Sequence, residues 1–195
     1  MIKTFSRKSE ERVKLFTVYS KFDNEIVKKG SELGFYLIGG TAIEIWLTYF
    51  GIKGWRKRSN NDIDFLFNEL DFDDRKYRGE FFKWQSKNVD SKSVKVDWFG
   101  IEGDCSEFLY KEIKGIKVMH PYFLFTSKYD RLQESDSEKD TERVKKDIKD
   151  LKDILKIINK MDKGFSKFQS YVDKFKNKEL SESVESLIQE FLDGE

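Results

Sequence analysis

Two adjacent glycines, Gly39 and Gly40, constrain this chain most, because they stand where an apolar run gives way to a helical pattern. Residues 35–38 before them are apolar and predict a short buried strand. After them, Thr41 is expected to cap a helix, since apolar residues recur at helical spacing as far as Phe50. Glycines let the backbone turn tightly and come close to a ligand. Because free amides at the positive end of a helix bind anions, the sequence predicts a phosphate site at this turn.

Two aspartates, Asp62 and Asp64, alternate with apolar residues in a segment that ends at Phe67. The two-residue period of a strand places both carboxylates on one face. At about 5 Å and an effective dielectric constant near 20, two such charges repel by roughly 3 kcal/mol, so the pair requires a cation, a basic side chain or a shared proton. Mg²⁺ is the natural candidate, since it takes oxygen ligands and often shares them with substrate phosphates; Mn²⁺ has similar preferences.

A third carboxylate is expected on a second alternating strand, at residues 94–99. The same two-residue period places Asp97 and Lys95 together on one face of that strand. Asp90 and Asp104 are weaker candidates, because they stand in loops flanked by serine or glycine.

Strand and helix patterns alternate over the first part of the chain, and only helical patterns follow. The expected fold class is α/β (α+β), a mixed β-sheet flanked by helices and followed by a small C-terminal helical bundle. The expected domains are 1–120 and 121–195. Gly30 is expected to end the first helix, and Gly115 to lie in a turn. The expected helices are about 10–29, 41–50, 71–86, 121–132, 144–158, 165–175 and 181–192, and the expected strands are 35–38, 62–67, 94–99 and 113–119.

Composition excludes several classes of function. The 37 basic and 36 acidic side chains leave a net charge of +1, so no global field recruits nucleic acid or a membrane. One cysteine, Cys105, and one histidine, His120, rule out an intrachain disulfide, a cysteine-based zinc cluster and a Ser-His-Asp triad, and His120 is expected to be structural. The sequence shows no signal-peptide core and no run of about 18 apolar residues, so a cytoplasmic protein is expected.

Taken in order, Gly39, Gly40 and Thr41 followed by Asp62-Ile-Asp64 resemble the signature of the DNA polymerase beta-like nucleotidyltransferase superfamily. Within it, they are most similar to the abortive-infection (AbiEii-type) toxin nucleotidyltransferases. The interval between the glycines and the first aspartate is longer here than in that family.

The resemblance continues downstream and covers about residues 37–151. Lys128, Arg131 and the sequence Lys-Asp-Ile-Lys-Asp-Leu at 146–151 match a lysine, an arginine and an Asp-x-x-Asp-Leu helix of these toxins in order. Physically, Lys128 could reach a triphosphate as a point charge while Arg131 orients it. The alternative is that both side chains form interhelical salt bridges with Asp147 and Asp150.

The resemblance implies an enzyme that transfers a nucleoside monophosphate from a nucleoside triphosphate to an acceptor hydroxyl on RNA or protein. It implies a nucleotidyltransferase-like domain at 1–120, Mg²⁺ or Mn²⁺ held by Asp62, Asp64 and Asp97, and phosphates bound at the glycine turn. Asp97 would also serve as the base for the attacking hydroxyl. A cognate antitoxin is an expected partner.

Two other functions remain open from the sequence. One is an adenylyltransferase of aminoglycoside type acting on a small molecule, since Gly-Gly-x-Ala followed by Asp-x-Asp also occurs there. The other is a nucleotide- or RNA-binding module without catalysis. The basic loop at 51–61 is read either as a phosphate or RNA contact or as a solvated loop.

Overall fold

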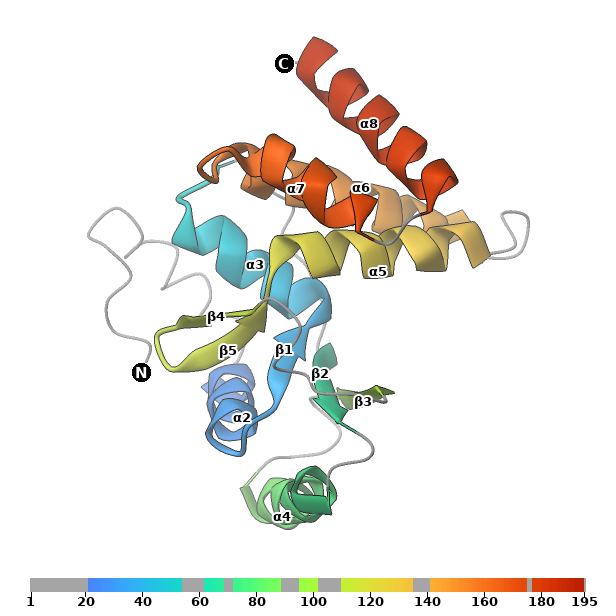
Figure 1. The fold of residues 1–195 in the computed structure, drawn as a ribbon. Coiled ribbons are helices and arrows are strands. Elements are labelled where there is room, and N and C mark those ends of the chain that lie inside the picture. The colour runs from blue at the N-terminus through green and yellow to red at the C-terminus, as the bar shows by residue number, and fades with distance from the viewer. Residues whose placement is uncertain are drawn as a thin grey trace. The chain divides into compact units, whose positions relative to one another are not determined.

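The computed structural model describes residues 21–53, 62–68, 72–88, 95–101, 110–134, 141–174 and 177–194. The chain divides into two compact units, 1–120 and 121–195. The first unit holds a five-stranded mixed sheet with helices, and the described part of the second is entirely helical (Figure 1). The expected α/β fold class with a C-terminal helical region is confirmed.

The sheet of the first unit has the strand order β3-β2-β1-β5-β4 (Figure 1). The strands β1 and β2 are antiparallel, as are β4 and β5, whereas β1 is parallel to β5 and β2 is parallel to β3. A crossover through α4 therefore joins the two parallel strands β2 and β3, as parallel neighbours require. The strands are β1 (Tyr36–Ile38), β2 (Asp62–Asn68), β3 (Lys95–Ile101), β4 (Tyr110–Ile113) and β5 (Ile116–Met119), and the helices are α2 (Lys21–Glu32), α3 (Gly39–Tyr49) and α4 (Phe72–Asn88).

One face of this sheet is built around the ring of Phe65, which is fully buried. The rings of Phe81 from α4 and of Trp98 from β3 lie 5.8 Å and 5.3 Å from it, between ring centroids, and Phe35 lies 6.3 Å away. Aromatic side chains of this size contribute most of the apolar area that a small core buries. Phe65 and Trp98 occupy the alternate positions to the aspartates of their strands, so the opposite face carries the charged residues.

The glycine that was expected to end the first helix lies inside it. The helix α2 continues through Gly30 to Glu32. A Cβ atom at Gly30 would overlap the ring of Phe65, so the glycine lets the helix approach the aromatic face of the sheet. The expected helix end at Gly30 is therefore wrong, because a close approach and not a turn accounts for this glycine.

The strand pattern at 113–119, with its expected turn around Gly115, belongs to a hairpin of β4 and β5. Its turn consists of Lys114 and Gly115, whose φ angles of 56° and 76° are typical of the turns that match the twist of paired strands. Gly115 lies in the turn, as expected, and Ile113 ends the first strand of the pair.

The second unit consists of α5 (Pro121–Glu134), α6 (Thr141–Asn159), α7 (Gly164–Asp173) and α8 (Lys178–Asp193). The four helices confirm the four that are expected from the sequence after residue 120. Phe125 of α5 packs on Phe168 of α7 with 4.9 Å between ring centroids, and the hydroxyl of Tyr122 donates to the carbonyl of Gly164 at 3.1 Å. No helix in the part of the chain that the structure describes is both long and apolar enough to cross a membrane.

Candidate active site

The glycine turn joins β1 directly to α3, with no residue between strand and helix. Gly39 has a φ of 67°, a left-handed conformation that favours glycine, and Ile38 is the N-cap in extended conformation. No side chain caps this helix, so the expected cap by Thr41 is wrong, because the helix begins two residues earlier than its apolar pattern suggests. Thr41 instead donates through Oγ1 to the backbone carbonyl of Asp62 at 3.5 Å, a contact between α3 and β2.

The turn and the aspartate strand are in direct contact. A Cβ atom at Gly39 would overlap Oδ2 of Asp64, so the carboxylate lies against the α-carbon of this glycine. The strand register agrees, because Ile38 at the end of β1 is the partner of Asp64 on β2. Glycine is therefore required at residue 39 both by its φ angle and by the space that Asp64 occupies.

The register of β2 and β3 places the three expected carboxylates on one face of the sheet. Asp64 is directly opposite Asp97, and Asp62 is opposite Lys95, in parallel strands. Residues that are opposite one another in neighbouring strands point to the same face, so Asp62, Asp64, Asp97 and Lys95 share it. The structure thus brings together the three aspartates that the sequence singled out. Their chemical roles stay predictions.

Lys95 is the residue of this face whose part the sequence reasoning missed. Its ammonium donates to Oδ2 of Asp97 at 2.6 Å, and the side chains of both residues are partly exposed to solvent. The hydrogen bond with Asp97 raises the pKa of Lys95 the most, followed by the charge of Asp97; Asp62 and Asp64 raise it further, while desolvation lowers it. The Lys-x-Asp spacing on a strand was the available signal, since it already placed both side chains on one face.

The donor chemistry of this face fits a hard divalent cation, because Asp62, Asp64 and Asp97 offer carboxylate oxygens. Their positions do not form a closed cluster. Among the described residues, no group of three or more His, Cys, Asp or Glu side chains is arranged to hold a metal ion. Asp97 is engaged by Lys95 in this arrangement.

Lys128 and Arg131 lie on α5 in the second unit, where they form ion pairs with α6. The Lys128 ammonium is 3.1 Å from Oδ1 of Asp147 and 2.9 Å from Oδ2 of Asp150. Arg131 donates to the same Asp147 through Nε at 2.8 Å and also through Nη2. Both aspartates are almost completely buried. The geometry is that of the interhelical salt bridges weighed as an alternative from the sequence.

His120 lies between β5 and α5 and next to Trp46, with 6.0 Å between the ring centroids. Burial lowers the pKa of His120 to about 4, and the charge of Lys111 adds to the effect. The Trp46 indole donates to the carbonyl of Met119 at 2.8 Å, so α3 and the end of β5 are also hydrogen-bonded beside the histidine. His120 is therefore packed against its neighbours and neutral at physiological pH.

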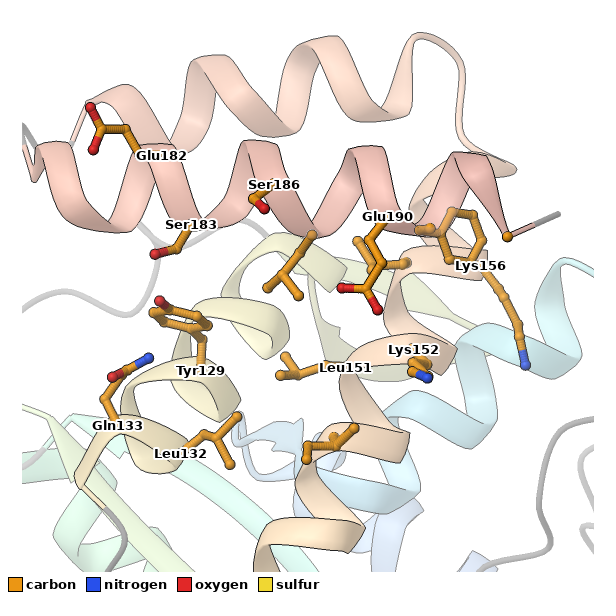
Figure 2. A pocket seen from close by; sticks show the side chains of 15 residues that line it. Tyr129, Leu132, Gln133, Leu151, Lys152, Lys156, Glu182, Ser183, Ser186 and Glu190 are labelled. Carbon is orange, nitrogen blue, oxygen red and sulfur yellow. The ribbon is translucent and has the colours of Figure 1, made fainter. Parts of the chain in front are cut away.

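A groove of about 980 Å³ lies in the second unit between α5, α6 and α8 (Figure 2). Polar side chains line its edges, with Lys152 on α6 and Glu190 on α8 among them. None of the site residues expected from the sequence lines this groove. Its apolar lining consists of Leu132, Ile148, Leu151, Leu155, Leu187 and Phe191, with Tyr129 beside them.

Several candidates lie outside the described residues. They are the alternative carboxylates Asp90 and Asp104, the single cysteine Cys105, and all of the basic loop beyond Lys53.

No protein-family model matches this chain, and neither a curated protein nor a solved structure matches it.

Proposed function

We propose that this chain is a metal-dependent nucleotidyltransferase. It would transfer a nucleoside monophosphate from a nucleoside triphosphate to an acceptor hydroxyl and release pyrophosphate. The observation that supports this most is the contact between the glycine turn and the aspartate strand, in which Asp64 lies against Gly39. A phosphate-binding turn and a pair of carboxylates must be this close together if one ligand is to engage both.

Each part of the first unit would have a defined task. The amides of Gly39, Gly40 and Thr41 lie at the N-terminus of α3, where backbone N–H groups lack helical partners and favour an anion, so they would bind the terminal phosphates. Asp62, Asp64 and Asp97 would hold Mg²⁺ or Mn²⁺. When bound, such a cation neutralises charge on the phosphates and makes the acceptor hydroxyl more acidic.

The covalent step needs little more from the side chains. The acceptor oxygen forms a bond to the α-phosphorus, the bond from that phosphorus to the β-phosphate oxygen breaks, and the electron pair leaves with pyrophosphate. A carboxylate oxygen of Asp97 would accept the hydroxyl proton. Positioning and charge neutralisation account for most of the catalysis in phosphoryl transfer of this kind.

The basic side chains of the second unit are already paired within that unit. Lys128 and Arg131 already have Asp147 and Asp150 as counter-ions, so a triphosphate would have to compete with two buried carboxylates for them. We therefore base the proposed function on the first unit. Nucleotide binding by Lys128 and Arg131 stays a prediction. An RNA or protein acceptor, a toxin-like effect and a cognate antitoxin are finer parts of the same proposal.

The test is transfer of label from each α-labelled nucleoside triphosphate in the presence of Mg²⁺ or Mn²⁺ and a total cell extract, with products separated by size. Asp62→Asn and Asp64→Asn should each lower transfer by more than about a hundredfold, since even the outer-shell partners of metal ligands are worth ten- to hundredfold. Glu142→Gln is the matched control, because that carboxylate is 92% exposed on α6. It should leave transfer unchanged.

The products separate the alternatives. Label on RNA or protein supports the toxin-like form, and label on a small hydroxylated acceptor alone supports an adenylyltransferase of small molecules. Binding of triphosphate without release of pyrophosphate supports a binding module. Transfer that persists in both aspartate variants would refute the proposed active site.

A further inference from the structure

The groove between α5, α6 and α8 has an apolar floor and two charged margins of opposite sign (Figure 2). The margin on α6 carries Lys152 and Lys156, and the margin on α8 carries Glu182 and Glu190. Figure 2 shows Lys152 and Glu190 on opposite sides of the groove. An apolar centre with a polar margin is the arrangement that protein surfaces have where another protein binds.

The dimensions of the groove match a short helix. Its lining extends over residues 148–156 of α6 and over residues 182–194 of α8. At a rise of 1.5 Å per residue these segments are about 12 Å and about 18 Å long, so they span two to three helical turns. Because three helices surround this volume of about 980 Å³, a further helix could pack its apolar face there as it would in a bundle.

The apolar side chains of the groove are not fully covered within the unit. Ile148 of α6 is 40% exposed, and Leu187 and Phe191 of α8 are half-buried, although all three line the groove. The apolar face of a bound helix would remove this surface from water, and burial of apolar surface is the main favourable term in protein association.

We propose that this groove binds an amphipathic helix of a protein partner, with acidic side chains on the flank that faces α6 and basic side chains on the flank that faces α8. Opposite charges then meet at both margins. A helix with charges of one sign on both flanks would face like charges at one margin, which disfavours it. The apolar stripe of the helix supplies affinity, and its two flanks fix the direction in which it lies. This inference concerns the second unit alone and does not depend on the proposed catalysis.

The experiment measures the binding of three fluorescein-labelled peptides to the full chain by fluorescence anisotropy. Each peptide has about 14 residues, a side-chain staple that holds it helical, and the same apolar stripe at heptad positions a and d. The first peptide carries Glu at positions g and Lys at positions e, the second carries Glu at both, and the third carries Lys at both. The first should bind at least about fivefold more tightly than either of the others, since each exposed charge contact changes affinity by about two- to fivefold.

Variants of the chain test the margins and the floor separately. Glu182→Lys/Glu190→Lys changes two exposed residues and makes both margins basic, so it should shift the preference to the peptide with Glu on both flanks. Ile148→Glu places a charge in the apolar lining and should weaken the binding of the first peptide by at least about tenfold. The matched control is Leu192→Glu, because Leu192 is a 47% exposed residue of α8 that does not line the groove. It should leave all three affinities unchanged.

A change of preference in Glu182→Lys/Glu190→Lys, together with unchanged affinities in Leu192→Glu, supports the inference. Failure of all three peptides to bind at about 100 μM would overturn it, and so would equal affinity for the three. Sedimentation of the full chain without peptide tests the other occupant. A dimer that Ile148→Glu dissociates would assign the groove to a second copy of this chain and overturn the inference of a helical partner.

Discussion

Replacing Lys128 with methionine tests how much the ion pairs between α5 and α6 contribute to the second unit. The Lys128 side chain is only 10% exposed, and its ammonium contacts Asp147, 2% exposed, and Asp150, which is fully buried. After the substitution Asp147 keeps Arg131, but Asp150 loses its ammonium partner. Removing one partner of a buried pair typically costs about 3–5 kcal/mol, because the remaining charge stays desolvated. We expect Lys128→Met to lower the free energy of unfolding by that amount.

A second substitution distinguishes a buried charge from a simple packing defect. In Lys128→Met/Asp150→Leu the buried carboxylate that lost its ammonium partner is gone, and replacing both members of a buried pair with apolar residues is often neutral or stabilising. The double variant should therefore recover most of the loss. Lys167→Met is the control in the same unit, since its ion pair with Asp162 is exposed and should be worth at most about 1 kcal/mol.

The assay is urea denaturation followed with two probes. All four tryptophans lie in the first unit, so their fluorescence reports on residues 1–120, whereas far-ultraviolet circular dichroism reports on the helices of both units. The loss in Lys128→Met should be visible by circular dichroism. A loss below about 1 kcal/mol, or a double variant as unstable as the single one, would refute the reasoning about a buried carboxylate that has lost its ammonium partner.

Two further predictions concern His120 and Gly39. Burial lowers the pKa of His120 from about 6.5 to about 4, so the unfolded chain binds this proton at a higher pH than the folded chain does. The free energy of unfolding should therefore be unaffected by His120 above pH 6.5 and should fall as the pH is lowered from 6.5 through 4, by about 3 kcal/mol in total. Nuclear magnetic resonance titration of the single histidine should give the low pKa, and His120→Gln should unfold with a weaker pH dependence over that range; a midpoint near 6.5 would contradict the burial. Gly39→Ala should destabilise the chain by more than Gly34→Ala in urea denaturation, by about 1–3 kcal/mol, because Gly34 also has a positive φ of 97° but has open space around it. Equal losses in the two alanine variants would show that the side chain of Asp64 can move away from residue 39 without loss of stability.

Much of the fold and of the site arrangement follows from local pattern. The alternation at 62–67 and 94–99 was enough to predict two strands and to place Asp62, Asp64 and Asp97 on the faces that the register confirms. In the same way, Pro121 predicted the start of α5, and apolar residues at helical spacing predicted the helices that follow it. Periodicity works for these elements because each presents one face to a core.

The features that local pattern did not predict depend on contacts between distant residues. Gly30 looked like a helix end, and only the position of Phe65 explains a glycine within α2. For Lys128 the sequence is compatible with both a ligand contact and a salt bridge, because the packing of α5 on α6 decides which carboxylates are in reach. The sequence does not predict the ion pair of Lys95 with Asp97, although the two residues stand two positions apart on one strand, because a lysine on a strand is most often simply solvated.

The aromatic packing around Trp98 has a consequence for the charged residues on the other side of the sheet. Since side chains alternate along a strand, sliding β3 by one residue along β2 would bury Asp97 and expose the indole. Burying the Asp97 carboxylate would cost desolvation energy, which already opposes such a slip. The edge-to-face contacts of Trp98 with Phe35 and Phe81, at 4.9 Å and 5.0 Å between centroids, would be lost as well and oppose it further. The packing of the hydrophobic core thus fixes the register of β3, and with it the face on which Asp97 lies. Replacing Trp98 would therefore disturb the arrangement of the carboxylates on the opposite face of the sheet.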